Sequence, residues 1–86
     1  MQSNVARAIA DLAARLNVGI ESVEFILAVP DDFPASNLGC GEFSEEPERP
    51  IPAFVAGQRI LLGVDGYCYV YHAHGVQVVY CGMAEG

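Results

Sequence analysis

Three cysteines and one histidine are the residues of this chain with the widest chemistry. They are Cys40, Cys68, Cys81 and His72. A thiolate is a nucleophile and a zinc ligand, and an imidazole can serve beside it as a base or as a further ligand. An odd number of cysteines permits one disulfide and one free thiol.

The residues leave the pairing of the cysteines open. A Cys40–Cys81 bridge would fasten the long central segment of the chain. Cys68–Cys81 is the rival bridge, because counting along the expected strands places these two residues opposite each other. The third alternative is three reduced thiols, since small apolar cysteines are often buried without a bridge.

The same residues raise the alternative of a thiol-dependent or metal-binding enzyme that uses Cys40, Cys68 or Cys81 with His72. The spacing argues against it, because no C-x-x-C or H-x-x-x-H pair is present. Cys68 and His72 would lie about 13 Å apart along one strand, too far to share an ion. A catalytic cysteine also needs a base in contact and a third group to orient that base. We therefore expect no catalytic residue, no metal and no cofactor.

The tyrosines form the second candidate site. Tyr67, Tyr69 and Tyr71, with His72, are a candidate interaction surface, because tyrosine offers rigid, amphipathic contact area. The competing interpretation is a core beneath a helix, with the hydroxyls at its rim, and the pattern favours it.

Charge and composition exclude several classes of partner. The chain has 86 residues, 11 of them acidic and only 4 basic, for a net charge of −7. Nucleic acid is not expected as a partner, because phosphate is bound by clustered lysine and arginine. No apolar run is long enough for membrane insertion. A cytoplasmic location follows if Met1 is the natural start, and a cell-envelope location if a leader has been removed.

An amphipathic helix is expected over residues 4–17. Val5, Ile9, Leu12 and Leu16 fall on one face. Ser3 suits the N-cap of this helix and Asn17 a left-handed C-terminal cap.

A strand is expected over residues 22–29, followed by a long loop over 30–56. Phe25 and Leu27 should point into the same core as the helix, and Pro30 should end the strand. A loop of this length is unusual in a compact domain.

Residues 57–81 should form a three-stranded meander with turns at Asp65-Gly66 and His74-Gly75. Its strands divide into two faces. The first face, where the helix should dock, carries Ile60, Leu62, Val64, Tyr67, Tyr69, Tyr71, Val78 and Tyr80. The second face carries Arg59, Leu61, Cys68, Val70, His72, Gln77, Val79 and Cys81.

The whole chain is therefore predicted to be one α+β domain. An N-terminal helix packs on a mostly antiparallel four-stranded sheet with a C-terminal meander and a long central loop. We expect a monomer in which that loop covers the second face through Phe33, Leu38, Phe43 and Phe54. A dimer that covers the same face is the alternative.

Four segments of the chain resemble a family of small uncharacterised bacterial domains. They are Leu38-Gly39-Cys40, Arg59-Ile60-Leu61-Leu62, Tyr69-Val70-Tyr71-His72 and Cys81. The family pattern runs W-P-D-x-S-L-G-C-P, P-G-Y-x-I-x-L, Y-x-Y-H and a closing cysteine, often in exported proteins or lipoproteins. Phe33 stands where the family has tryptophan, and Gly41 replaces the proline after Cys40. The resemblance implies the same fold and a Cys40–Cys81 pairing, and it brings no activity. We therefore predict a non-catalytic interaction or accessory domain with a protein partner.

Overall fold

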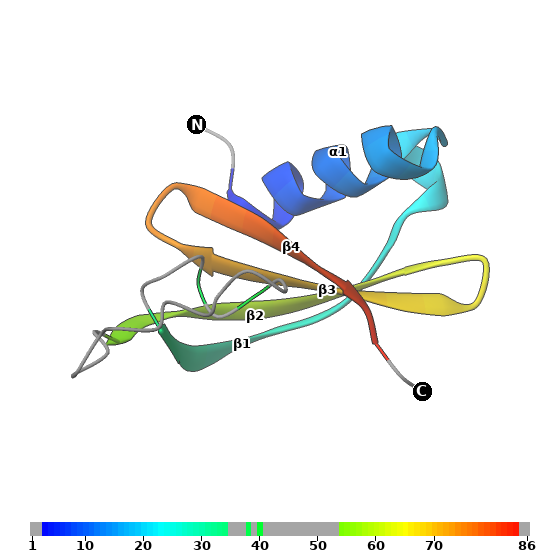
Figure 1. Cartoon of the computed structure of the whole chain (residues 1–86). Helices are drawn as coiled ribbons and strands as arrows, with labels where there is room; N and C mark the ends of the chain where they lie inside the picture. Colours follow the sequence, from blue (N-terminus) through cyan, green and yellow to red (C-terminus); the bar gives the residue numbers. More distant parts are fainter. Residues whose placement is uncertain (1–2, 35–37, 39, 41–53, 85–86) are drawn as a thin grey trace.

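A computed structural model describes residues 3–34, 38, 40 and 54–84 of the chain. The elements are α1 (Asn4–Leu16), the short 3₁₀ helix η1 (Ile20–Ser22), β1 (Glu24–Pro34), β2 (Phe54–Val64), β3 (Tyr67–His74) and β4 (Gln77–Met83). The strands form one antiparallel sheet in the order β1-β2-β3-β4, and α1 lies across one face of it (Figure 1). The α+β class, the N-terminal helix and the four-stranded antiparallel sheet are confirmed.

Both ends of α1 form as the sequence predicts. The Ser3 hydroxyl accepts a hydrogen bond of 3.1 Å from the backbone N–H of Ala6, which satisfies a donor at the start of the helix. Asn17 takes the left-handed conformation at φ 58°, and its N–H donates to the carbonyls of the last turn. These caps fix the direction in which α1 meets the sheet.

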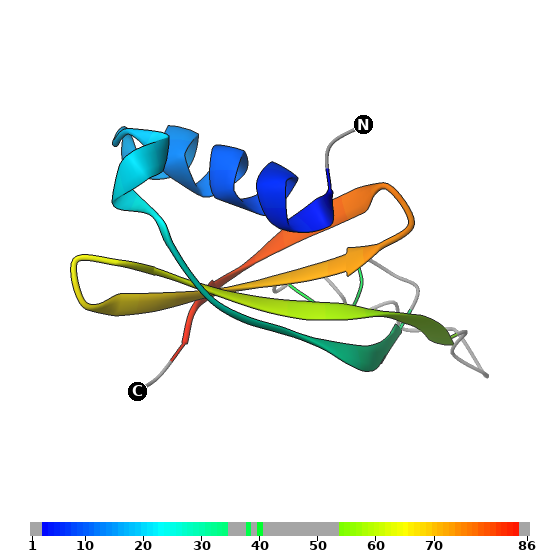
Figure 2. The same ribbon diagram turned by 180° about the vertical axis from the view of Figure 1, so that it is seen from behind.

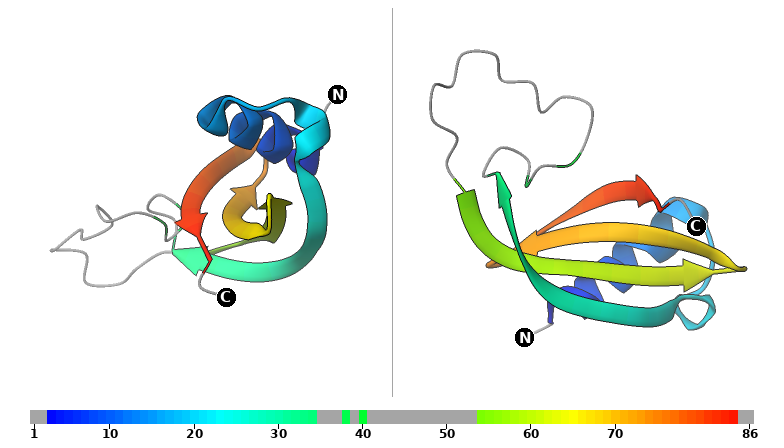
Figure 3. Two further views of the ribbon diagram at one scale, coloured as in Figure 1. Left: turned by 90° about the vertical axis from the view of Figure 1, so that its right-hand side faces the viewer. Right: turned by 90° about the horizontal axis from the view of Figure 1, so that it is seen from below.

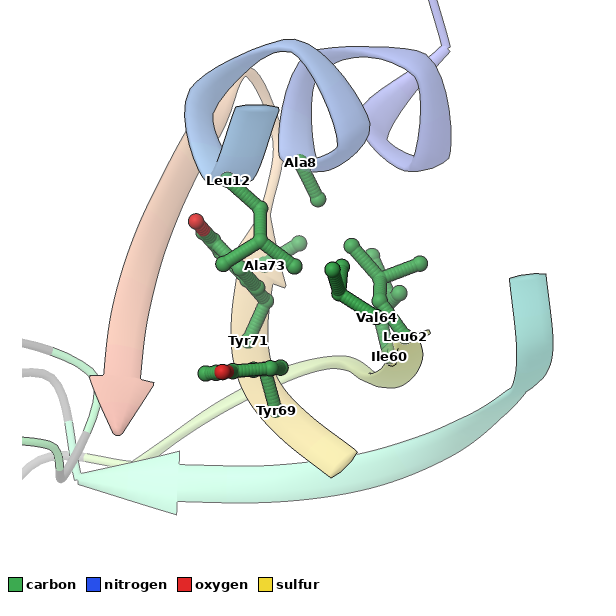
Figure 4. Close-up of a cluster of buried hydrophobic side chains, with 8 residues drawn as sticks. All are labelled: Ala8, Leu12, Ile60, Leu62, Val64, Tyr69, Tyr71 and Ala73. Carbon is green, nitrogen blue, oxygen red and sulfur yellow. The ribbon is translucent and has the colours of Figure 1, made fainter. Parts of the chain in front are cut away.

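The main core lies between α1 and the sheet. Ala8 and Leu12 point from the helix toward the side chains of β2 and β3 (Figure 4). The buried members of this cluster are Ala8, Leu12, Ile60, Leu62, Val64, Tyr69, Tyr71 and Ala73. Every member from the sheet except Ala73 was predicted on the first face, so the docking face is confirmed. The sheet curls so that its edge strands β1 and β4 approach α1 from either side (Figure 3).

The first turn of the meander is confirmed and the second lies one residue later than predicted. Asp65 and Gly66 have φ of 53° and 85°, as a type I′ turn requires. The second turn is at Gly75-Val76, between the paired residues His74 and Gln77.

The later turn moves the register of β4 by two residues. Tyr71 therefore pairs with Tyr80 instead of Val78. A shift of two keeps the side chains from Gln77 to Tyr80 on their predicted faces, because the side-chain period of a strand is two. A bulge follows, so that Tyr69 pairs with Met83.

β1 is longer than predicted. It continues through Pro30 to Pro34, and β2 begins at Phe54, so the predicted loop over 30–56 is wrong at both ends. Proline is tolerated here because β1 is an edge strand, where a missing N–H costs no ladder bond on the outer side. Of residues 35–53, only Leu38 and Cys40 are among those the structure describes.

A bulge in β1 makes one expectation about its faces wrong. The register shifts between Phe25 and Leu27, which pair with Leu62 and Leu61 respectively. The extra residue turns Phe25 and Leu27 to opposite faces of the sheet. Both side chains are exposed, at 49% and 36%, instead of sharing the core. Ala28, opposite Ile60, packs against the core in their place.

Candidate functional site

Cys40 and Cys81 are joined by a disulfide, with their Cα atoms 5.0 Å apart. This confirms the pairing that the family resemblance implied. The rival Cys68–Cys81 bridge is wrong, as is the alternative of three reduced thiols. The shifted register of β4 and the bulge that pairs Tyr69 with Met83 together place Ala84 beside Cys68, so that the N–H of Ala84 donates to the Cys68 carbonyl. Cys68 is half-buried and not bridged.

His72 lies next to the bridge on the second face of the sheet. Its Nδ1 is 2.8 Å from the carbonyl oxygen of Leu38 and 3.1 Å from Sγ of Cys40. A carbonyl oxygen can only accept, so Nδ1 must carry the proton. The Nδ1–H group is therefore a donor held between the Leu38 carbonyl and the Cys40 sulfur.

Phe33 completes this cluster from the far side of β2. Its ring stacks on the imidazole of His72, with centroids 3.8 Å apart and planes at 16°. Phe33 belongs to β1 and His72 to β3, so the ring must cross the strand between them. Gly57 of β2 permits this crossing, because a Cβ there would lie 3.1 Å from the Phe33 ring and would clash with the Ala73 carbonyl oxygen.

Three residues of this region are almost completely buried. The exposed fractions are 3% for Phe33, 1% for Leu38 and 3% for Cys40. Together with His72 and Cys81 they form a second, small core, which we call the bridge cluster. It lies on the face of the sheet opposite α1, near the C-terminal end of β1. Phe33 and Leu38 thus pack as predicted, whereas Phe54 is 59% exposed and Phe43 lies outside the described residues.

The bridge cluster also contains the ligand types of a metal centre. One donor atom from each of Cys40, His72 and Cys81 lies within 4.8 Å of the other two. With the bridge closed, each sulfur is bonded to the other, and the histidine nitrogen that faces them carries a proton. Metal binding would require two electrons to open the bridge and the loss of that proton. Cys68 pairs with Gly63 and is not part of the cluster.

The four residues of the predicted interaction surface lie in three different places in the structure. They are Tyr67, Tyr69, Tyr71 and His72. Tyr71 is fully buried and Tyr69 is 9% exposed, both beneath α1. Tyr67, the first residue of β3, is 59% exposed. His72 lies on the opposite face, within the bridge cluster. The structure does not gather them into one surface.

A polar network that the sequence did not reveal joins α1 to the sheet. The Tyr71 hydroxyl donates to Asp11 at 2.6 Å, and Nε of Arg15 donates to the same carboxylate oxygen at 2.6 Å. The Arg15 guanidinium also lies 4.4 Å from the centre of the Tyr80 ring. Only the Asp11–Arg15 spacing of four residues signals this network.

The network perturbs the acidity of its members. Burial, and then the hydrogen bond to Asp11, raises the pKa of the Tyr71 hydroxyl far above its usual 10. Burial opposes ionisation of Asp11, but the hydrogen bonds from Tyr71 and Arg15 outweigh it and lower the pKa of that carboxyl. The arrangement holds α1 in place, and we assign it no chemistry.

Comparison with models of known families, with curated proteins and with solved structures found no match to this chain. The resemblance to the bacterial domain family therefore stays a prediction. Within the described residues, no helix has the length and apolar character needed to cross a membrane.

Among the described strands β1 pairs only with β2, and it exposes a group of apolar side chains. β1 lies at the outer margin of the sheet (Figure 2). Phe25, Ile26, Leu27 and Val29 are 49%, 41%, 36% and 40% exposed. Phe25 and Leu27 were expected in the core beneath the helix, and the bulge places them on opposite faces of the sheet instead.

Proposed function

We propose that this chain is a non-catalytic interaction domain that binds an extended segment of a protein partner along the free edge of β1. The observation that supports this proposal is the exposed apolar group over residues 25–29. An edge strand also presents unpaired backbone N–H and C=O groups, with which an added strand can pair.

The two halves of β1 differ in a way that limits where a partner would bind. Edge strands are usually protected by charges and prolines. The second half of β1 has this protection in Pro30, Asp31, Asp32 and Pro34, and Asp31 forms an ion pair of 2.9 Å with Arg59. The half before Pro30 has one charge, Glu24, and the bulge between Phe25 and Leu27, and its remaining side chains are apolar. We therefore assign the contact with the partner to residues 25–29.

Charge indicates what should flank the bound segment. The net charge of −7 attracts basic groups and speeds their encounter with the domain. The expected ligand is an extended stretch with alternating apolar residues, because alternate side chains of an added strand face the same side, and with lysine or arginine beside it.

The bridge cluster supports a non-catalytic function over the enzyme alternative. Its two cysteines are bonded to each other in the disulfide. The Nδ1–H of His72 donates a hydrogen bond to the carbonyl oxygen of Leu38. A nucleophilic cysteine needs a free thiol and a base able to take its proton. Neither is offered by the cluster in its bridged state.

Selection from a phage-displayed library of random dodecapeptides tests the proposal, followed by titration calorimetry of the selected peptides. We expect Phe25→Lys to weaken binding by at least about tenfold, or ~1.4 kcal/mol. Phe54→Lys is the matched control, since Phe54 is also an exposed strand phenylalanine, at 59% against 49%. It should change the affinity by no more than about twofold. Equal weakening by both variants, or no peptide enriched above a blank surface, would contradict the proposal.

A further inference from the structure

The two cysteines of the bridge differ in their exposure. Cys40 is buried, with 3% of its surface exposed. Cys81, in the last strand, is only half-buried. Solvent therefore has more access to Cys81 than to Cys40, and access is one of the factors that decide which sulfur an incoming thiol attacks.

The two sulfurs also differ in the polar atoms beside them. Cys40 Sγ has the Nδ1–H donor of His72 at 3.1 Å. Cys81 Sγ has the carbonyl oxygen of Val79 at 3.5 Å. A donor stabilises a negative charge on sulfur, whereas the negative end of a carbonyl dipole opposes one. When the bond between the sulfurs breaks, the negative charge is more stable on Cys40 than on Cys81.

Exposure and polarity thus both favour attack on the sulfur of Cys81 and departure of Cys40 as the thiolate. We propose that Cys40–Cys81 is an exchange-active disulfide, in which a glutathione-type thiolate attacks Sγ of Cys81 and His72 stabilises Cys40 as the leaving thiolate. This reactivity is independent of the proposed binding edge on β1.

The exchange step is balanced as follows. The attacking thiolate forms a bond to Sγ of Cys81, the bond between Cys81 and Cys40 breaks, and its electron pair passes to Sγ of Cys40. The product is a mixed disulfide on Cys81 with a thiolate on Cys40. A second thiol then displaces Cys81 as a thiolate. Two thiols are thereby oxidised to one disulfide while the bridge takes up two electrons, and both cysteines are protonated from solvent.

The position of the mixed disulfide tests the direction of attack. The Cys68→Ala protein is incubated at neutral pH with reduced glutathione, free thiols are blocked with N-ethylmaleimide, and tryptic peptides are analysed by mass spectrometry. Cleavage after Arg59 separates Cys40 from Cys81. We expect glutathione on the peptide that contains Cys81 and the maleimide on the peptide that contains Cys40. Glutathione on Cys40, equal labelling of both, or no reaction of the folded protein would overturn the proposal.

A pair of histidine variants tests the contribution of His72. His72→Phe keeps a ring for the stack on Phe33 but removes the donor. His74→Phe is the control, because His74 also places Nδ1 2.9 Å from a carbonyl oxygen, that of Ala56, but does not contact the bridge. A leaving thiol departs more slowly as its pKa rises. Taking for it the coefficient near 0.5 that holds for the attacking thiol, each unit slows cleavage about threefold. We expect His72→Phe to react at least about threefold more slowly with glutathione, and His74→Phe to match the parent.

The histidine comparison is made at temperatures where circular dichroism shows both variants folded. A His72→Phe rate equal to the parent's would refute the stabilising contact. The adduct position on the Cys68→Ala protein remains a separate test, since that protein keeps His72.

Discussion

Opening the Cys40–Cys81 bridge should remove much of the stability of this domain. The bridged residues are separated by 41 positions. In the chain-entropy model, a cross-link over such a loop lowers the entropy of the unfolded chain by about 13 cal/mol/K, or ~4 kcal/mol at 25 °C. A chain of 86 residues has a total stability of about 4–13 kcal/mol. The bridge therefore accounts for about 30% or more of the total.

The native contacts of the bridge cluster should change little when the bridge opens. The Nδ1–H of His72 keeps the Leu38 carbonyl as its acceptor, and the ring keeps its stack on Phe33. The free-energy change thus comes mainly from the unfolded chain, which becomes less compact. The dependence of stability on urea should accordingly be steeper in the reduced protein, since more surface is exposed on unfolding.

Urea and thermal unfolding of the Cys68→Ala protein, with and without a phosphine reductant, measure this effect. We expect a loss of about 4 kcal/mol, equivalent to a fall in Tm of roughly 15–30 °C for a domain of this size. A variant that also carries Cys40→Ala and Cys81→Ala should match the reduced protein and should not respond to the reductant. Alanine is chosen because a serine hydroxyl at the buried Cys40 position could lack a partner. A loss below about 1 kcal/mol would refute the entropic reasoning.

Three further outcomes are expected. Tyr71→Phe should cost about 1–2 kcal/mol in urea unfolding through its lost hydrogen bond to Asp11. Because the pKa of Tyr71 is raised, the parent should have its full stability below pH 10 and lose it as the pH rises further, and the variant should lose less there. Gly57→Ala should lower Tm far more than Gly63→Ala, since its Cβ meets a backbone carbonyl, whereas the Cβ at Gly63 meets the end of a flexible side chain at 3.2 Å. Sedimentation should show a monomer, as predicted for a loop within 30–56 that covers the second face; a tight dimer would contradict this.

The parts of the fold that the sequence predicted depend on local signals. The caps at Ser3 and Asn17 and the turn at Asp65-Gly66 each follow from the conformations that a few neighbouring residues allow. The face that binds α1 follows from the side-chain period of two, which survived a wrong turn position because the register moved by an even number of residues.

The parts that were missed depend on position in the sheet or on distant contacts. Pro30 ends a central strand but is accepted in an edge strand, and the sequence does not say which strand lies at the edge. The bulge after Phe25 carries no glycine to mark it. Contacts of His72 with Phe33 and Leu38 join segments more than thirty residues apart, so no spacing rule could reveal them.

The bridge cluster and the exposed apolar residues share one strand, β1. The cluster holds the end of β1, because the ring of Phe33 passes over β2 at Gly57 and stacks on His72 in β3. The residues proposed to bind a partner, 25–29, lie in the other half of the same strand and precede Pro30. An edge strand offers its unpaired backbone groups to another strand while its inner side stays paired with its neighbour in the sheet. Opening the bridge releases Cys40 but leaves the stack of Phe33 on His72, so the edge should keep its shape while the domain as a whole becomes less stable. Binding at residues 25–29 should therefore persist in the reduced protein, up to the lower temperature at which that protein unfolds.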